Sequence, residues 1–119
     1  MNHKQAVGRF GEDLAKDYLI RHGYKIIAAN IKTSYKEIDI VAEKNKVLVF
    51  VEVKTRTSKI FGGADETITH SKIENLKQAV SAYLMSVKNK KGDFRLDLIS
   101  IDIEKDKKIA KIKHYKDII

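Results

Sequence analysis

The segment that most constrains the fold is the β-branched run VLVFVEVKTR at residues 47–56. Side chains of a strand alternate between its two faces, and the odd-numbered side chains up to position 53 are all valine. The even-numbered side chains change from apolar to charged along the run: Leu48, Phe50, Glu52, Lys54 and Arg56. One apolar face and one half-apolar face are typical of a strand inside a sheet that is covered on both sides.

Signals in the flanking sequence place two helices and four further strands around this run. Asn2, followed three residues later by Gln5, forms a capping-box pattern that predicts a helix over residues 2–22. Thr69 or Ser71 can cap a second helix, since either hydroxyl can accept a hydrogen bond from the first turn. Strands are predicted over residues 24–31, 37–43, 94–103 and 109–115. This order predicts an α/β fold, with a mixed central sheet flanked by helices.

Two glycines interrupt the first predicted helix. Gly8 and Gly11 should each cost about 1 kcal/mol relative to alanine inside a helix. We expect them at positions where another part of the chain comes close to the helix backbone.

Length and composition limit what the chain can be. A chain of 119 residues fits one domain, and we expect a single domain over residues 1–119. The absence of cysteine excludes disulfides, thiolate metal sites and cysteine nucleophiles. Neither a signal peptide nor a membrane-spanning apolar run is visible, so a cytoplasmic location away from membranes is expected.

The net charge of +8 favours a polyanionic partner. A basic surplus on a small domain is typical of nucleic-acid binding, although a lysine-rich solvated surface gives the same number. The histidines have no metal-ligand spacing, and we expect them on the surface. They are His3, His22, His70 and His114.

The second and third predicted strands place two carboxylates together. Asn45 and Lys46 fit a two-residue hairpin turn, and counting outward from it puts Asp39 opposite Glu52. Directly opposed residues have Cβ atoms roughly 5 Å apart. Two carboxylates so close repel each other unless a cation lies between them. We therefore predict that Asp39 and Glu52 bind Mg²⁺ or Mn²⁺, hard ions that prefer oxygen ligands.

The next opposed pair in this register is Glu37 and Lys54. Lys54 would lie beside the two carboxylates, where its charge can hold a scissile phosphate or polarise an attacking water. Glu37 would support Lys54 as an ion-pair partner. The alternative is an ordinary hairpin with cross-strand ion pairs, because Glu-x-Lys occurs widely by chance.

Three segments in this order resemble the YraN-like family of uncharacterised bacterial proteins. They are Gly11-Glu12, the run EIDIVA at residues 37–42 and the run FVEVKTR at residues 50–56. That family is assigned to the PD-(D/E)XK superfamily of restriction-endonuclease-like nucleases, and archaeal Holliday-junction resolvases are relatives. The resemblance covers nearly the whole chain and implies a restriction-endonuclease-like core.

The resemblance also implies roles for the matched polar residues. Asp39 and Glu52 are the implied metal ligands, Lys54 is the implied catalytic lysine, and Glu12 is implied to face the same site. The implied activity is that of a Mg²⁺- or Mn²⁺-dependent endonuclease that hydrolyses DNA, with branched or junction DNA as one substrate class.

DNA contacts are expected from the basic residues Arg56, Lys59 and Lys72. Resolution of a symmetric junction would call for a homodimer. The alternative function is a non-catalytic nucleic-acid-binding module of the same fold. The sequence favours the enzyme, because a module that never binds metal has no need of Asp39 and Glu52 placed together.

Overall fold

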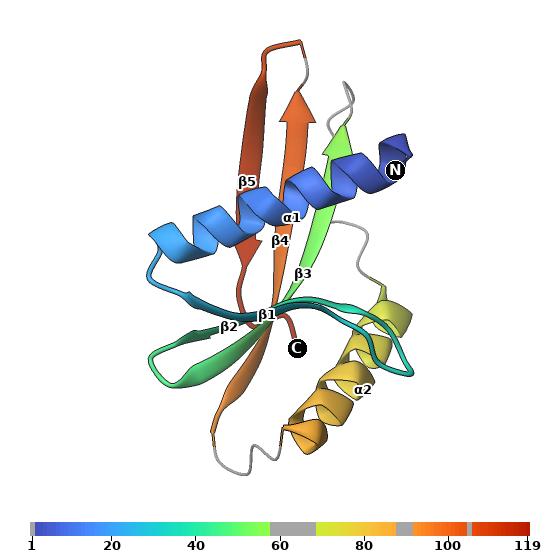
Figure 1. The fold of residues 1–119 in the computed structure, drawn as a ribbon, viewed down its shortest axis with the longest axis vertical. Coiled ribbons are helices and arrows are strands. Elements are labelled where there is room, and N and C mark those ends of the chain that lie inside the picture. Colours follow the sequence, from blue (N-terminus) through green and yellow to red (C-terminus); the bar gives the residue numbers. More distant parts are fainter. Residues whose placement is uncertain (1, 58–68, 88–91, 105) are drawn as a thin grey trace.

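The structure is a computed structural model that describes residues 2–57, 69–87, 92–104 and 106–119. The described residues form two helices and five strands in the predicted order (Figure 1). They are α1 (His3–Arg21), β1 (Lys25–Ile31), β2 (Ile38–Lys44), β3 (Val47–Thr57), α2 (His70–Ser86), β4 (Phe94–Glu104) and β5 (Ile109–Tyr115). Each strand lies within one residue of its predicted bounds.

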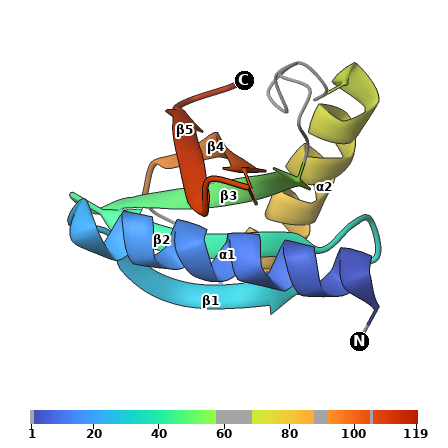
Figure 2. The ribbon, with the colours of Figure 1, turned by 90° about the horizontal axis from the view of Figure 1, so that it is seen from above.

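The strands form one mixed sheet in the order β1-β2-β3-β4-β5. Neighbouring strands are antiparallel except β3 and β4, which are parallel and connected through α2. Figure 2 shows α1 along one face of the sheet and α2 on the other side of it. The prediction of an α/β fold with β3 inside the sheet is confirmed, and the architecture is compatible with a restriction-endonuclease-like core.

The alternation of β3 produces two hydrophobic clusters. On the valine face, Val49 and Val51 pack with Ala15 and Leu19 of α1. On the opposite face, Phe50 packs against α2, whose buried residues are Leu76, Ala79 and Val80. Because β3 is apolar on both faces at its centre, it anchors both helices.

The turn between β2 and β3 sets their register. Asn45 and Lys46 have φ angles of 52° and 65°, the left-handed conformation that a two-residue hairpin turn requires. Pairing then runs outward from Lys44 with Val47 to Ile40 with Val51, as the turn predicted.

Side chains fix where the helices begin. The Asn2 side chain accepts a hydrogen bond from the Gln5 backbone and Gln5 returns one, which confirms the capping box. Thr69 is the N-cap of α2, and its hydroxyl accepts a hydrogen bond from the Lys72 backbone at 3.1 Å, so Ser71 lies inside the helix. Within the described part of the chain, neither helix is long and apolar enough to cross a membrane.

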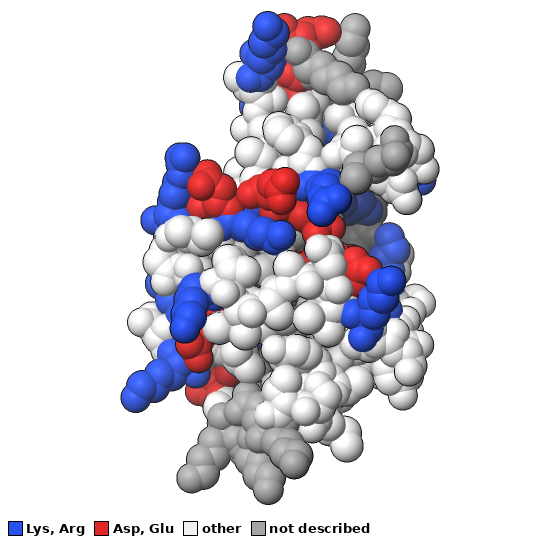
Figure 3. All heavy atoms as spheres, in the orientation of Figure 1, with Lys and Arg blue, Asp and Glu red and all other residues white. Residues whose placement is uncertain are grey.

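Charges of both signs share the face that carries α1. Figure 3 shows basic and acidic side chains side by side in a band across this face. On α1, Arg21 and Asp17 form an ion pair of 3.0 Å, and Lys16 and Asp13 approach to 4.0 Å. This face is therefore not a uniformly basic surface.

Candidate metal centre

The candidate site lies where β2 and β3 separate. The ladder between them extends to Ile40 and Val51, and the next pair in that register is Asp39 and Glu52. At this point the Oδ2 atom of Asp39 accepts a hydrogen bond of 2.8 Å from the Val53 backbone. The Asp39 side chain thus replaces a strand-to-strand hydrogen bond and holds the end of the hairpin together.

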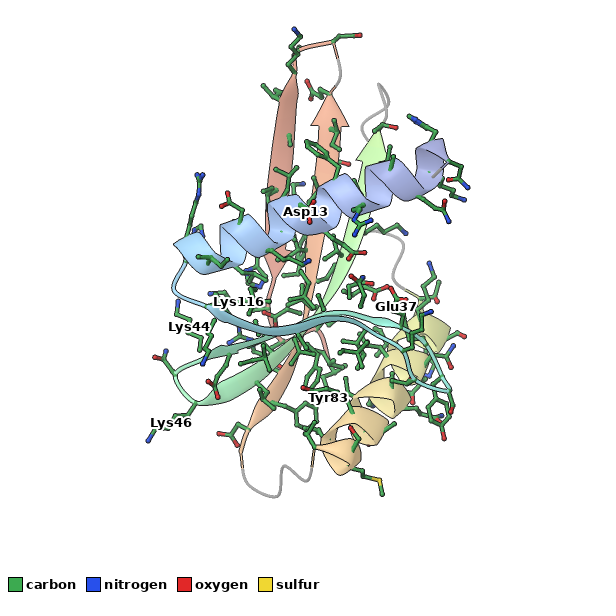
Figure 4. The ribbon with its side chains drawn as sticks, viewed as in Figure 1. Asp13, Glu37, Lys44, Lys46, Tyr83 and Lys116 are labelled. Carbon is green, nitrogen blue, oxygen red and sulfur yellow. The ribbon has the colours of Figure 1, made fainter. Side chains whose placement is uncertain are left out.

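Three carboxylates gather beside this separation. Glu12, Glu37 and Asp39, here called the carboxylate trio, each offer one oxygen, and these oxygens lie within 4.8 Å of one another. They come from α1, from the residue before β2 and from β2 itself. Figure 4 labels Glu37 where the chain enters β2.

Asn30, near the end of β1, connects two members of the trio. Its Nδ2 atom donates to Glu12 at 2.7 Å and to Glu37 at 3.3 Å. Asn30 has a φ of 52°, a left-handed conformation that asparagine tolerates better than most residues. The sequence analysis missed Asn30, although an asparagine inside a β-strand is an unusual signal.

Close packing of α1 on β3 brings Glu12 to the site. Gly11 is buried against the Thr55 side chain, which a Cβ atom at position 11 would strike. The predicted close approach is confirmed at Gly11 and wrong at Gly8, where a Cβ would meet nothing within 4 Å. Successive helix positions point in different directions. Glu12 therefore approaches Glu37 and Asp39, while Asp13 is exposed on α1 (Figure 4).

Burial and neighbouring charges raise the pKa of Asp39 to about 7. Burial is the larger cause, and the negative charges of Glu52 and Glu12 act in the same direction. The hydrogen bond from Val53 and the positive charge of Lys36 oppose the shift. Glu52 is thus close enough to Asp39 to act on its ionisation, although it is outside the trio.

Glu52 forms an ion pair with Lys36. Lys36 Nζ lies 3.0 Å from Oε1 and 2.8 Å from Oε2 of Glu52. Both side chains are largely withdrawn from water, Lys36 being 25% exposed and Glu52 18% exposed. The sequence analysis missed Lys36, because the loop that carries it gives no periodic pattern.

Basic residues adjoin the carboxylates. Burial and the positive charges of Lys72 and Arg56 lower the pKa of Lys54, and Glu52 opposes this shift. Lys54, Arg56 and Lys72, here called the basic cluster, come from the end of β3 and the first turn of α2. Lys59, which the sequence also predicted to contact DNA, lies outside the described residues.

The donor atoms fit a hard divalent cation. The trio supplies carboxylate oxygens alone, which Mg²⁺ and Mn²⁺ prefer over nitrogen or sulfur ligands. The raised pKa of Asp39 agrees with this, because crowded carboxylates stay ionised together only when a cation compensates them. Glu37, which the sequence suggested as a partner of Lys54, takes its place among the potential ligands.

A second charged group lies on β4, where Asp97 pairs with Val51 of the neighbouring strand β3. Asp97 is fully buried and accepts two hydrogen bonds from Arg95, at 2.8 and 2.9 Å. His114 lies 2.7 Å from it and the Asp117 backbone donates at 3.0 Å. Burial opposes ionisation of Asp97, but the hydrogen bonds from His114, Arg95 and Asp117 outweigh it and hold its pKa below the usual value.

The prediction that His114 lies on the surface is wrong. Its side chain is 4% exposed, and its Nδ1 atom lies 3.1 Å from the Tyr18 hydroxyl. The reason is β-strand alternation, since His114 shares a face of β5 with Ile112, which packs on the α1 cluster. The other three histidines are exposed, as predicted.

Comparison with known proteins supports the resemblance seen in the sequence. The model of the "Uncharacterised protein family UPF0102" matches residues 11–101. A UPF0102 protein of Syntrophomonas wolfei is 45% identical over 108 residues, which cover 91% of this chain and 92% of the relative. A UPF0102 protein of Caldicellulosiruptor bescii is 42% identical over 118 residues, 98% of each chain. The chain therefore belongs to the UPF0102 family.

Proposed function

We propose that this protein is a nuclease that hydrolyses phosphodiester bonds of DNA with Mg²⁺ or Mn²⁺. The observation that carries the proposal is the carboxylate trio, with its oxygens within 4.8 Å of one another. Carboxylates at this separation repel, and a divalent cation among them turns the repulsion into attraction. The resemblance to restriction-endonuclease-like nucleases, which assigns Asp39, Glu52 and Lys54 to such a site, points the same way.

The basic cluster supports a phosphate-containing substrate. Burial, together with repulsion from Lys72 and Arg56, lowers the pKa of Lys54, and an anion among these three residues would relieve that repulsion. Glu52 acts electrostatically on both Asp39 and Lys54, so it is close to the acidic and to the basic group. A phosphate held by the basic cluster would therefore be next to the carboxylates.

Each group then has a part in the proposed reaction. The basic cluster binds and orients the DNA phosphate, and Lys54 places positive charge beside the scissile bond. Glu12, Glu37, Asp39 and Glu52 are the residues that would hold the cation, and Asp39 has to be ionised to do so. A bound divalent cation supplies positive charge at the phosphate and acidifies water there.

Branched or junction DNA is the substrate class that we propose, on the resemblance to junction resolvases. Cutting two strands symmetrically requires two active sites, so a homodimer is part of this proposal. Light scattering of the protein with a four-way junction tests it, with duplex DNA of equal length as the control.

The decisive experiment is a cleavage assay with Mg²⁺ or Mn²⁺ on labelled duplex, single-stranded, flap and four-way-junction DNAs. We expect metal-dependent products, strongest on a branched substrate, and no products in EDTA. A protein that binds these DNAs but cuts none of them, and binds no metal in calorimetry, is instead a non-catalytic nucleic-acid-binding module.

A further inference from the structure

The Lys36–Glu52 ion pair has a special place in the candidate site. The lysine ammonium contacts both carboxylate oxygens of Glu52, at 3.0 and 2.8 Å. It also counteracts the shift in the pKa of Asp39, so its charge acts on a second acidic residue. Lys36 thus supplies within the chain the kind of charge that a bound cation would bring.

The loop before β2 holds the Lys36 backbone in place. Thr33 Oγ1 donates to the Lys36 carbonyl at 2.7 Å and accepts from the Lys36 and Tyr35 backbone at 3.1 Å each. With the backbone fixed, the long side chain remains the adjustable part of the pair. Rotation about the bonds of the four-carbon lysine stem allows the ammonium to move from Glu52 into water while the loop backbone stays in place.

Glu52 cannot bind the Lys36 ammonium and a divalent cation tightly at the same time. An ammonium that contacts both oxygens occupies the lone pairs that a divalent ion would use, and two cations on one carboxylate repel each other. The ion pair is partly exposed, so it is weak and can be broken by a stronger ligand.

We propose that Lys36 is a built-in counter-ion that occupies Glu52 in the metal-free protein and releases it when a divalent cation binds. Lys36 thereby lowers the affinity of the site for metal and stabilises the crowded carboxylates when no metal is present. This inference rests on the proposed metal site and adds the residue that regulates it.

The first test measures Mn²⁺ binding by calorimetry in the absence of DNA. In wild type, the apparent affinity is the intrinsic affinity multiplied by the fraction of molecules in which Lys36 has left Glu52. Lys36→Met keeps the aliphatic stem but removes the charge, and it should bind Mn²⁺ up to about fivefold more tightly. Lys36→Arg can keep the ion pair and should bind like wild type.

Lys32→Met is the matched control, because Lys32 is an exposed lysine of the same loop. It removes the same charge and should leave Mn²⁺ affinity almost unchanged. Equal or weaker binding by Lys36→Met, or an equal gain in Lys32→Met, would overturn the inference.

The second test follows the release of Lys36 in the wild-type protein. Acylation of lysine amines by a water-soluble reagent, quantified by mass spectrometry, should become faster at Lys36 when Mg²⁺ is added and stay constant at Lys32. Tighter binding in Lys36→Met with unchanged Lys36 reactivity would show a long-range charge effect and contradict release. This readout remains decisive if Lys36→Met fails to fold.

The outcomes also separate this inference from the proposed function. Equal metal affinity in wild type and Lys36→Met would contradict the counter-ion role of Lys36 but would leave the proposed metal site in place. Binding by Lys36→Met alone supports the counter-ion and shows why wild type needs substrate to load metal. Absence of binding by both proteins overturns both proposals.

Discussion

Asp39 and Asp97 lie on strands of the same sheet, yet their surroundings push their pKa values in opposite directions. Burial and the charges of Glu52 and Glu12 raise the pKa of Asp39 to about 7. Asp97 is completely buried, but hydrogen bonds from His114 and Arg95 more than compensate and lower its pKa.

The two aspartates differ in what surrounds them within the chain. Asp97 is satisfied from within the chain. Its hydrogen-bond partners are Arg95 on β4, His114 on β5 and the backbone of Asp117, which follows β5. Around Asp39 the chain instead assembles further carboxylates. Crowded like charges cost stability, and the proposed cation site would account for their presence here. The predictions below test this contrast.

The largest expected effect is on cleavage. Asp39→Ala or Glu52→Ala should reduce the rate of DNA cleavage by about a thousandfold or more, because each removes a carboxylate from the proposed cation site. DNA binding in EDTA should be unchanged or slightly tighter, since a repulsive charge is gone. Asp13→Ala, on the exposed side of α1, is the control. If Asp39→Ala cleaves DNA at the wild-type rate, Asp39 is not a ligand of the proposed cation.

Lys54→Ala should affect both steps. Cleavage should fall by about a hundredfold or more, because charge at the scissile phosphate is lost. Binding should weaken too, unlike in the carboxylate variants. Gel-shift titration in EDTA and single-turnover cleavage measure the two effects, with the exposed Lys25→Ala as control. Tighter DNA binding by Lys54→Ala would place this lysine away from the DNA.

Asp97→Ala should damage the fold instead of the site. It removes the buried carboxylate that pairs with Arg95 and His114, and breaking a fully buried ion pair typically costs about 3–5 kcal/mol; the loss here should lie at or below the low end, because Arg95 is 25% exposed. Urea unfolding measures this loss, and Asp39→Ala should show no comparable loss. At a temperature where the variant is folded, its Mn²⁺ affinity should equal that of wild type. Intact stability in Asp97→Ala would remove the proposed division between the two aspartates.

Salt dependence reports the DNA contacts. Arg56→Ala and Lys72→Ala should each reduce the slope of log affinity against log salt concentration by about 1, because each loses one phosphate contact. Lys59→Ala gives the same test for a residue outside the described part of the chain. Slopes identical to wild type would exclude these side chains as phosphate ligands.

The smallest effect is a pH dependence of opposite sign at the two aspartates. Asp39 has a folded pKa of about 7, above its unfolded value, so its contribution to stability is present at low pH and lost as pH rises through about 7. In EDTA, Asp39→Asn should therefore melt above wild type at pH 8, with a smaller difference at pH 5.

Asp97 provides the opposite sign. Its folded pKa is lowered, so its contribution is present above the unfolded value of about 3.9 and is lost as pH falls through the folded pKa. The destabilisation of Asp97→Asn should thus shrink only in acid. Melting differences of the same sign and pH range for both variants would contradict the comparison.

Much of the hairpin was predictable because it depends on local rules. A two-residue turn at Asn45 and Lys46 and alternation along β3 fix the register, which pairs the strands as far as Ile40 and Val51 and makes Asp39 and Glu52 the next positions. Helix caps were predictable for the same reason, since they involve residues only three apart. The participation of Glu12 came from the resemblance to a known family.

The sequence by itself thus determined the strand register, the helix starts and the candidate pair on the hairpin. Only the tertiary structure decided which distant groups join them: Asn30 beside Glu12, Lys36 on Glu52, and His114 on Asp97. The physical reason is range. Backbone dihedrals and alternation act over a few residues, whereas these contacts depend on how α1 packs on β3 at Gly11 and how five strands align in space.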